Sequence, residues 1–313
     1  MAGPLSGLAG HWFAPAPATR LATLRVLLGG YGLWYVGRRV GMYRRIARTN
    51  RRLYLPVGAA RLNPRPVPQP VFDAALVATL AANTAVVVGW RYPITGPIYG
   101  GLLLWLLSYR NSWTMIFHSD NVLVFHALIL GCAPAADALA LDARRGGALP
   151  RTLLAGPDRN PAGDWHYGWP IRLMNAVTAA TYLLAGVAKL AGPSGRQWAT
   201  GDGLRSQIAT DALRKELLGT APPPYLQAVY RQVALLRVLA IGSLVLEALA
   251  PLFLVDRRLA RFWAVNAFLM HWGIFGIMKI RFRYQLSGVI YAPLFDVERP
   301  VAWLAERVVP RDR

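Results

Sequence analysis

The residue of this sequence best suited to chemistry is a lysine near the end of an apolar run. Lys189 stands one residue before the end of the run from Asn175 to Leu190, and it is one of only three lysines among 35 basic residues. An ammonium group at membrane depth costs about 2.5 kcal/mol or more, so such a residue usually faces a protein interior or an aqueous cavity. The alternative is an anchor whose flexible stem carries the charge out to the lipid headgroups.

The small and polar residues of this run recur at spacings of three and four, which places them on one face of a helix. The face consists of Asn175, Thr178, Tyr182, Ala185 and Lys189, with Gly186 beside them. The other faces are apolar and compatible with lipid. We therefore expect this stripe to face protein.

Two histidines, His118 and His126, stand eight residues apart and would lie on one side of a continuous helix. A metal pair is one interpretation, but no third ligand follows at a useful spacing, and we predict no metal site. The other interpretation is a hydrogen-bonded helix start, with Ser119, Asp120 or Asn121 as the cap.

Two more ionisable residues interrupt apolar runs. Glu247 lies in the run 233–255, and His271 lies in the run 262–280. An acid at this depth is expected to be neutral or paired. We expect Glu247 to face the interior and to pair with a basic or hydroxyl group from another helix.

The elements that position these residues are apolar runs of helical length. The chain is 55% hydrophobic with 11 tryptophans, and its mean hydropathy is +0.31. These values predict an all-α fold, a polytopic integral membrane helix bundle of about seven to eight transmembrane helices. The expected spans are 19–36, 72–90, 94–109, 122–140, 175–190, 233–255 and 262–280, with a doubtful eighth at 286–294.

The domain organisation follows from these runs. We expect a flexible N-terminal tail at 1–18, a transmembrane domain at 19–298 and a basic C-terminal tail at 299–313. Within the domain, the proline-rich stretch 56–70 and the loop 141–170 should lie outside the hydrocarbon, because irregular backbone cannot face lipid. An amphipathic segment at 204–217 should lie along the membrane surface. The single cysteine excludes an intrachain disulfide.

The formal charge of +20 does not indicate nucleic acid binding, because the arginines stand mostly between apolar runs. Residues 38–52 hold seven arginines and no acid, a pattern that stays cytoplasmic and can touch anionic lipid headgroups. This orientation puts the N-terminus outside and Lys189 near the inner end of its helix. The expected location is a plasma membrane of the bacterial type, with the lipid bilayer as a partner, and no removable signal peptide is expected.

The stretch from Tyr182 to Leu190, followed by Trp198 and Gly201, resembles a segment of the horizontally transferred transmembrane (HTTM) domain family, which includes the vitamin K-dependent gamma-carboxylase. Supporting matches are an arginine-bearing first span at 24–30, Asn111-Ser-Trp113 with a histidine nearby, and the helix of His271. Together these matches cover nearly all 313 residues.

The resemblance implies that Lys189 is a base in the oxidation of a reduced quinone of the vitamin K type, with His118 or His126 as its partner. It also implies a cofactor site at Tyr182, Gly186, Trp198, Glu247 and His271. Two departures stand out: Ala188 occupies the place of a second lysine, and the carboxylase's large extramembrane domain has no counterpart in these 313 residues. Protein carboxylation is therefore not expected.

Two hypotheses follow. The first is an enzyme, a membrane-embedded oxidoreductase or carboxylase-like catalyst that uses a reduced quinone. The second is a non-catalytic membrane module that binds lipid or quinone, or scaffolds a protein partner that the sequence does not identify. In the second case the polar stripe serves helix packing.

Overall fold

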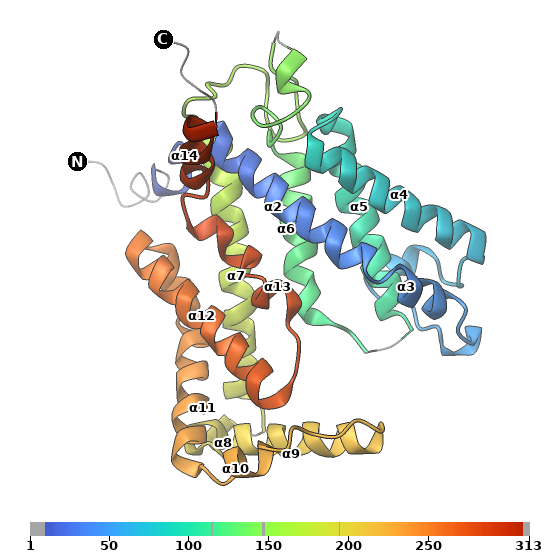
Figure 1. Cartoon of the computed structure of the whole chain (residues 1–313), viewed down its shortest axis with the longest axis vertical. Helices are drawn as coiled ribbons and strands as arrows, with labels where there is room; N and C mark the ends of the chain where they lie inside the picture. Colours follow the sequence, from blue (N-terminus) through green and yellow to red (C-terminus); the bar gives the residue numbers. More distant parts are fainter. Residues whose placement is uncertain (1–9, 114, 146–147, 194, 309–313) are drawn as a thin grey trace. The chain divides into compact units, whose positions relative to one another are not determined.

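The computed structural model describes residues 10–113, 115–145, 148–193 and 195–308. Every regular element among them is helical, which confirms the all-α class, and the described β-pairing is limited to two isolated bridges, Ala16 with Asp164 and Thr152 with Ala155 (Figure 1). The chain divides into two compact units, Met1–Met174 with Asp296–Arg313, and Asn175–Phe295.

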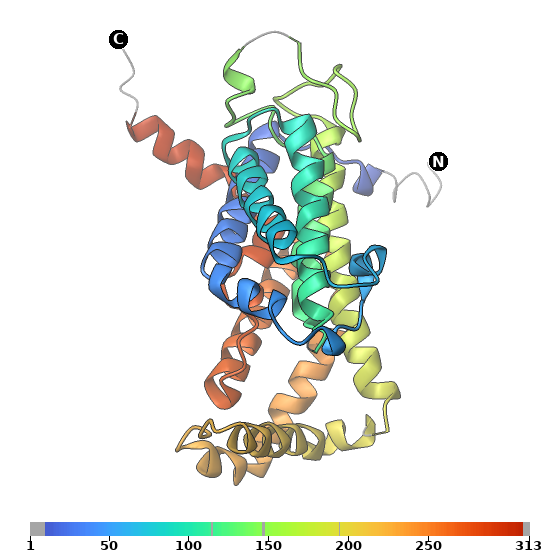
Figure 2. The ribbon, with the colours of Figure 1, turned by 90° about the vertical axis from the view of Figure 1, so that its right-hand side faces the viewer.

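Four long helices lie side by side in the first unit (Figures 1 and 2). They are α2 (Ala18–Gly37), α4 (Gln69–Val88), α5 (Tyr92–Asn111) and α6 (Asn121–Cys132). The helices α4 and α5 form a hairpin, and its tight turn uses the left-handed backbone of Gly89 and Arg91. Shorter elements complete the unit: α3 (Val40–Ala47), η1 (Arg51–Leu53), η2 (Gly58–Leu62), η3 (His118–Asp120), η4 (Ala143–Arg145) and α14 (Glu298–Val308).

A buried arginine on α2 forms hydrogen bonds to α4 and to the chain that follows α6. Arg25 is fully buried on α2 and donates from Nη1 to the carbonyl of Val86 at 3.1 Å. Its Nη2 donates to the carbonyl of Leu139 at 2.5 Å. The first of these carbonyls belongs to the last turn of α4, where the helix dipole favours a cation.

The second unit begins within α7 (Trp165–Ala191), whose first turns belong to the first unit. In Figure 1, α8, α9 and α10 lie crosswise at the lower ends of α11 and α12. Buried Ile208, Leu226, Leu236 and Met278 join α9, α10, α11 and α12 in one apolar cluster. The elements are α8 (Gly195–Thr200), α9 (Asp202–Leu217), α10 (Leu226–Tyr230), α11 (Val233–Ala248), η5 (Ala250–Leu254), α12 (Arg257–Met278), α13 (Arg283–Leu286) and η6 (Val289–Leu294).

Prolines explain most differences between the predicted runs and the helices. The run 122–140 ends as a helix at Cys132, because Pro134 forces Ala133 into extended backbone. The run 233–255 ends as an α-helix at Ala248, shortly before Pro251, and continues as the 3₁₀ turn η5. The run 286–294 forms α13 and η6, not a spanning helix.

The number of helices able to span a membrane is lower than expected. Among the described helices, only α4 and α7 are long and apolar enough to cross a bilayer, judged by length and composition alone. A spanning helix needs about 20 mostly apolar residues, whereas α6 has 12 residues and α11 has 16. Arginines lower the hydropathy of α2 and α12, which are long enough.

The two predicted tails are partly structured. Ala16 exchanges two backbone hydrogen bonds of 3.1 Å with Asp164, so the chain before α2 is held against the loop before α7. At the other end α14 occupies 298–308, and Arg20 anchors its start through Glu298 at 2.6 Å and Asp296 at 2.7 Å. Residues 1–9 and 309–313 lie outside the described part of the chain.

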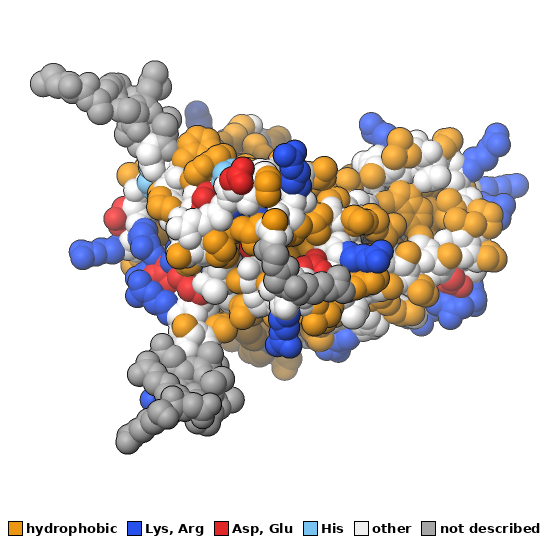
Figure 3. All heavy atoms as spheres, turned by 90° about the horizontal axis from the view of Figure 1, so that it is seen from above, with side chains coloured by type: hydrophobic (Ala, Val, Ile, Leu, Met, Phe, Trp, Pro, Cys, Tyr) orange, Lys and Arg blue, Asp and Glu red, His pale blue; other side chains and the backbone are white. Residues whose placement is uncertain are grey.

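Large apolar side chains are exposed on the long helices, and the space-filling view shows hydrophobic side chains over much of the visible face (Figure 3). In the part of α7 that belongs to the second unit, the exposed large apolar side chains are Leu184, Val187 and Leu190. Those exposed on α11 and α12 include Leu235, Val238, Val245, Phe262, Val265, Leu269 and Trp272.

Candidate functional site

A lysine and a glutamate from two helices of the second unit form the centre of the candidate site. Lys189 of α7 donates from Nζ to both carboxylate oxygens of Glu247 of α11, each at 2.5 Å. The side chain of Lys189 is 25% exposed and that of Glu247 is 9% exposed. The expectation that Glu247 pairs with a basic group from another helix is confirmed.

A glycine brings the two helices close enough for this contact. A Cβ atom on Gly186 would lie 2.8 Å from the backbone nitrogen of Ala248 and 3.1 Å from its Cα. Only glycine fits at this distance without a shift of backbone, as at other close crossings between membrane helices. Gly186 stands one turn before Lys189, and Ala248 follows Glu247, so the crossing sets the position of both charged groups.

An indole ring also lies near the ammonium group of Lys189. Lys189 Nζ is 4.8 Å from the ring centroid of Trp198, a distance typical of a cation–π contact. Trp198 belongs to α8, and its ring lies so close to Gly203 of α9 that a Cβ atom added at Gly203 would be 3.2 Å from the ring. Gly201, between these two helices, has a φ of +87° and lies so close to Arg237 of α11 that no side chain fits there.

The helix dipoles stabilise one charge of the pair and destabilise the other. Lys189 lies in the last turn of α7, where the helix dipole favours a cation. Glu247 lies in the last turn of α11, where the same dipole disfavours an anion. Because Glu247 is also mostly buried, its negative charge depends on the ammonium group of Lys189. The two residues therefore form one electrostatic unit.

A second polar cluster lies two helical turns before Lys189 on the same face of α7. The hydroxyl groups of Tyr182 and Tyr291 are 2.7 Å apart. The Nδ1–H group of His271 donates to the carbonyl oxygen of Ala267 at 2.8 Å, because a carbonyl oxygen can only accept a hydrogen bond. The same Nδ1 atom lies 3.4 Å from the hydroxyl oxygen of Tyr182. All three side chains are buried.

A tryptophan links this cluster to the end of α11. Trp263 of α12 packs edge to face on Tyr182, with ring centroids 4.7 Å apart. Its indole N–H donates to the carbonyl of Leu246 at 2.9 Å. Leu246 directly precedes Glu247 in the chain. The side chain of Trp263 therefore contacts both Tyr182 and the end of α11 that carries Glu247.

The stripe predicted on α7 therefore faces protein. Asn175 donates to the carbonyl of Pro293 at 3.4 Å, Thr178 is buried, and Tyr182, Gly186 and Lys189 make the contacts described above. Ala185, expected on the same face, is exposed.

The two histidines predicted as partners of Lys189 belong to the first unit. His118 is exposed in η3. His126 is fully buried in α6, and its Nε2 lies 3.0 Å from the carbonyl of Met174, to which it donates. The structure therefore brings together Lys189, Glu247 and Trp198 in one group, and Tyr182 and His271 in a second.

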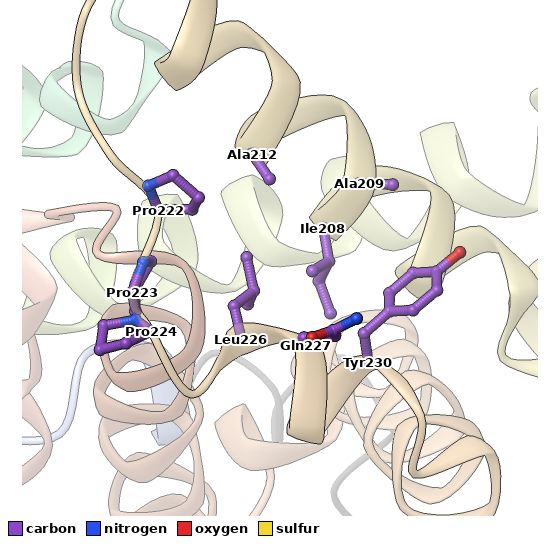
Figure 4. A pocket seen from close by; sticks show the side chains of 9 residues that line it. All are labelled: Ile208, Ala209, Ala212, Pro222, Pro223, Pro224, Leu226, Gln227 and Tyr230. Carbon is purple, nitrogen blue, oxygen red and sulfur yellow. The ribbon is translucent and has the colours of Figure 1, made fainter.

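The described residues hold no group of three or more His, Cys, Asp or Glu side chains arranged to bind a metal ion. They do include a small open pocket of about 380 Å³ between α9 and α10, which is lined by Ile208, Ala212, the three prolines 222–224 and Tyr230, among others (Figure 4). None of the predicted site residues lines this pocket.

Sequence reasoning missed two members of the site, Tyr291 and Trp263. Tyr291 lies in the short apolar run 286–294, where no polar periodicity marks it. Trp263 lies at the start of an ordinary apolar run. The partner of Glu247 could not be predicted either, because the periodicity of one helix does not show which residue 58 positions away in the chain contacts it.

Comparison with known proteins adds no assignment: no family model, no curated protein and no solved structure matches this chain.

Proposed function

We propose that this chain is an integral membrane protein. The support is its apolar exterior: large hydrophobic side chains are exposed along α7, α11 and α12, whereas soluble monomers rarely expose such extended apolar surface. Two of its helices, α4 and α7, have the length and hydropathy of membrane spans. The remaining long helices would cross with help from their packed neighbours and from arginines near their ends. We place it in a plasma membrane of the bacterial type.

The Lys189–Glu247 pair is the polar end of a binding site for a reduced quinone. The observation that carries this proposal is the pair's position, mostly desolvated yet still reachable, with Nζ 2.5 Å from both carboxylate oxygens and Lys189 one quarter exposed. A ligand with a hydroxyl group on an aromatic ring and an apolar tail fits this donor set. The ammonium and the carboxylate would hold the hydroxyl, the Trp198 ring would lie beside the aromatic ring, and the apolar side chains of α7 would contact the tail.

The pair can accept one proton from a bound ligand. Lys189 can pass a proton from Nζ to a carboxylate oxygen of Glu247, which becomes a neutral acid, and then accept another proton at Nζ. After both transfers Lys189 is again an ammonium group and Glu247 is protonated. The pair then carries one extra positive charge beside the bound ligand, where it stabilises a negative charge.

A bound reduced quinone would supply an acidic phenol-type hydroxyl and two reducing electrons. The resemblance of Tyr182–Leu190 and Trp198 to the HTTM domain family supports this class of cofactor and the role of Lys189 as base. The proposed reaction class is therefore quinone-linked proton abstraction, carboxylase-like in its first step. His118 and His126 remain proposed partners by resemblance alone, and the cluster of Tyr182 and His271 is proposed to support the quinone site.

A titration of the full chain in nonionic detergent with a short-chain quinol, followed by quenching of tryptophan fluorescence, tests this proposal. We expect saturable binding that Lys189→Met weakens by at least tenfold, which corresponds to about 1.4 kcal/mol. Lys279→Met is the matched control, because Lys279 is exposed and forms no ion pair within the described part of the chain. Equal weakening by both variants, or no saturable binding at all, would refute the site.

The second candidate is a non-catalytic membrane module that binds lipid or quinone, or scaffolds a partner protein. One observation favours it: the charges of Lys189 and Glu247 satisfy each other without any ligand. In that case quinol binding would be absent or would leave the quinol unchanged, and the pair would serve only to join α7 to α11. Product analysis after incubation with quinol and oxygen separates the two candidates.

A further inference from the structure

A second polar surface of the molecule lies in the first unit, in the segment between α2 and α4. Residues 38–65 contain nine arginines and no acidic residue. We name this stretch the basic segment. It includes α3, η1 and η2, and it lies far in the sequence from the residues of the quinone site.

Most of these arginines have no hydrogen-bond or ion-pair partner among the described residues. Arg44 pairs with Asp73, with two contacts of 3.1 Å, and Arg38 and Arg39 lie over the rings of Trp34 and Tyr35. The other six side chains are exposed and make no hydrogen bond or ion pair with any described residue: Arg45, Arg48, Arg51, Arg52, Arg61 and Arg65. Six unpaired guanidinium groups on one short stretch form a surface for a polyanion.

Exposed leucines lie among these arginines. Leu53 is 60% exposed, Leu55 is 74% exposed and Leu62 is 83% exposed. A nucleic acid backbone offers no apolar surface for such side chains. A phospholipid layer offers both chemistries at once, since phosphates lie at its surface and hydrocarbon begins a few ångströms below.

The basic segment is also held beside the ends of two long helices of the first unit. The backbone N–H of Leu55 donates to the carbonyl of Ser112 at 2.8 Å, and that of Val57 donates to the Ser112 hydroxyl at 3.1 Å. These bonds fix the segment to the C-terminal end of α5. The candidate span α4 starts at Gln69, four residues after Arg65.

We propose that the basic segment is a docking surface for anionic phospholipid headgroups, with the six unpaired arginines on the phosphates and the three leucines in the outer hydrocarbon. Each basic residue near such a surface contributes about a fivefold increase in affinity, and added salt weakens the attraction. The proposal rests on the membrane location proposed above, but not on the quinone site.

The test uses the full chain in nonionic detergent, titrated with mixed micelles of the same detergent and either phosphatidylglycerol or phosphatidylcholine. We expect the phosphatidylglycerol micelles to bind more tightly, and Arg48→Gln/Arg51→Gln/Arg52→Gln to weaken that binding about a hundredfold. The single change Arg52→Gln should weaken it about fivefold and leaves the fold least disturbed. The matched control is Arg196→Gln/Arg231→Gln/Arg237→Gln, which removes the same charge from exposed arginines of the second unit that form no ion pair with any described residue.

Equal binding of both lipids, or equal losses in the two triple variants, would overturn the proposal. So would displacement of the micelles by inorganic phosphate at moderate concentration, which would identify a simple anion site, or tighter binding of a short RNA than of phosphatidylglycerol. Because Lys189 and Glu247 are unchanged in every variant, quinol binding by the same samples shows separately whether the proposed function holds.

Discussion

Gly186 and Ala248 lie at a close approach of α7 and α11, because a Cβ atom on Gly186 would lie 2.8 Å from the backbone nitrogen of Ala248. The atoms in its way are backbone, which cannot move without a shift of a whole helix. We therefore expect Gly186→Ala to lower the free energy of unfolding by about 1–3 kcal/mol. Thermal unfolding of the detergent-solubilised chain measures the change.

Gly242→Ala is the matched control for this crossing. Gly242 also lies inside a helix, α11, but a Cβ atom there would meet nothing within 4 Å. Replacement of an unconstrained helical glycine by alanine should stabilise by about 0.5–1 kcal/mol. If both changes affect unfolding alike, the close approach at Gly186 does not set the position of the pair.

The pair itself is best tested by a double-mutant cycle. Lys189→Met leaves the mostly buried carboxylate of Glu247 without its cation, and we expect a loss of about 2 kcal/mol, less than for a fully buried pair because Lys189 is partly exposed. Lys189→Met with Glu247→Leu replaces both charges by apolar groups of similar size. The double variant should unfold close to the wild-type temperature. Additive losses in the cycle would contradict the coupling of the two residues.

The sequence was a good guide wherever a single helix carried the signal. The stripe of Tyr182, Gly186 and Lys189 was visible because it repeats with the period of one helix. The same local reasoning was wrong for residues 165–170, which were predicted as the end of a loop because of their aromatic residues and Pro170. In the structure, α7 begins at Trp165. Pro170 lies near the start of α7, where its missing N–H costs only one hydrogen bond within the helix.

Arg25 provides a prediction for the first unit. Its guanidinium group is fully buried and donates to the carbonyls of Val86 and Leu139. The Val86 carbonyl also accepts from the backbone N–H of Gly89, so the Leu139 carbonyl loses most when Arg25 is removed. Arg25→Met should lower the free energy of unfolding by about 2 kcal/mol.

Arg45→Met serves as the comparison for Arg25, because Arg45 is exposed and makes no ion pair within the described part of the chain. We expect its unfolding temperature to match the wild type. A stable Arg25→Met variant would mean that the buried arginine does not fasten α2 to the end of α4.

Asp256 provides a pH-dependent test at the start of α12. Its carboxylate accepts hydrogen bonds from the backbone N–H groups of Leu259 at 3.0 Å and Arg258 at 2.8 Å. These bonds hold the pKa of Asp256 below its usual range, so the cap is fully formed above about pH 4 and is lost as the pH falls through the lowered pKa of the folded state.

Hydrogen exchange of the Arg258 and Leu259 amides measures this cap. Protection should fall on acidification in the wild type. Asp256→Asn keeps a side-chain oxygen at the cap but cannot titrate, so its protection should change less with pH. An identical acid response in both proteins would show that another group controls the start of α12.

The long-range part of the site was not predictable from the sequence for a physical reason. Periodicity shows which face of a helix is polar, but not which other helix meets it. The sequence therefore predicted the kind of group that pairs with Glu247 but not the residue. In the structure, the close crossing at Gly186 brings Lys189 to Glu247. The same limit applies to Tyr291, whose 3₁₀ turn reaches Tyr182 from 109 residues away in the chain.

The central claim is that Lys189 and Glu247 hold a quinone in a membrane. The most direct measurement is solvent extraction and mass spectrometry of quinone that co-purifies with the full chain from bacterial membranes. We expect near-stoichiometric quinone in the wild type and in Lys279→Met, and a loss of at least tenfold in Lys189→Met and in Glu247→Leu. Equal amounts of quinone in all four proteins, or none in the wild type, would contradict the account.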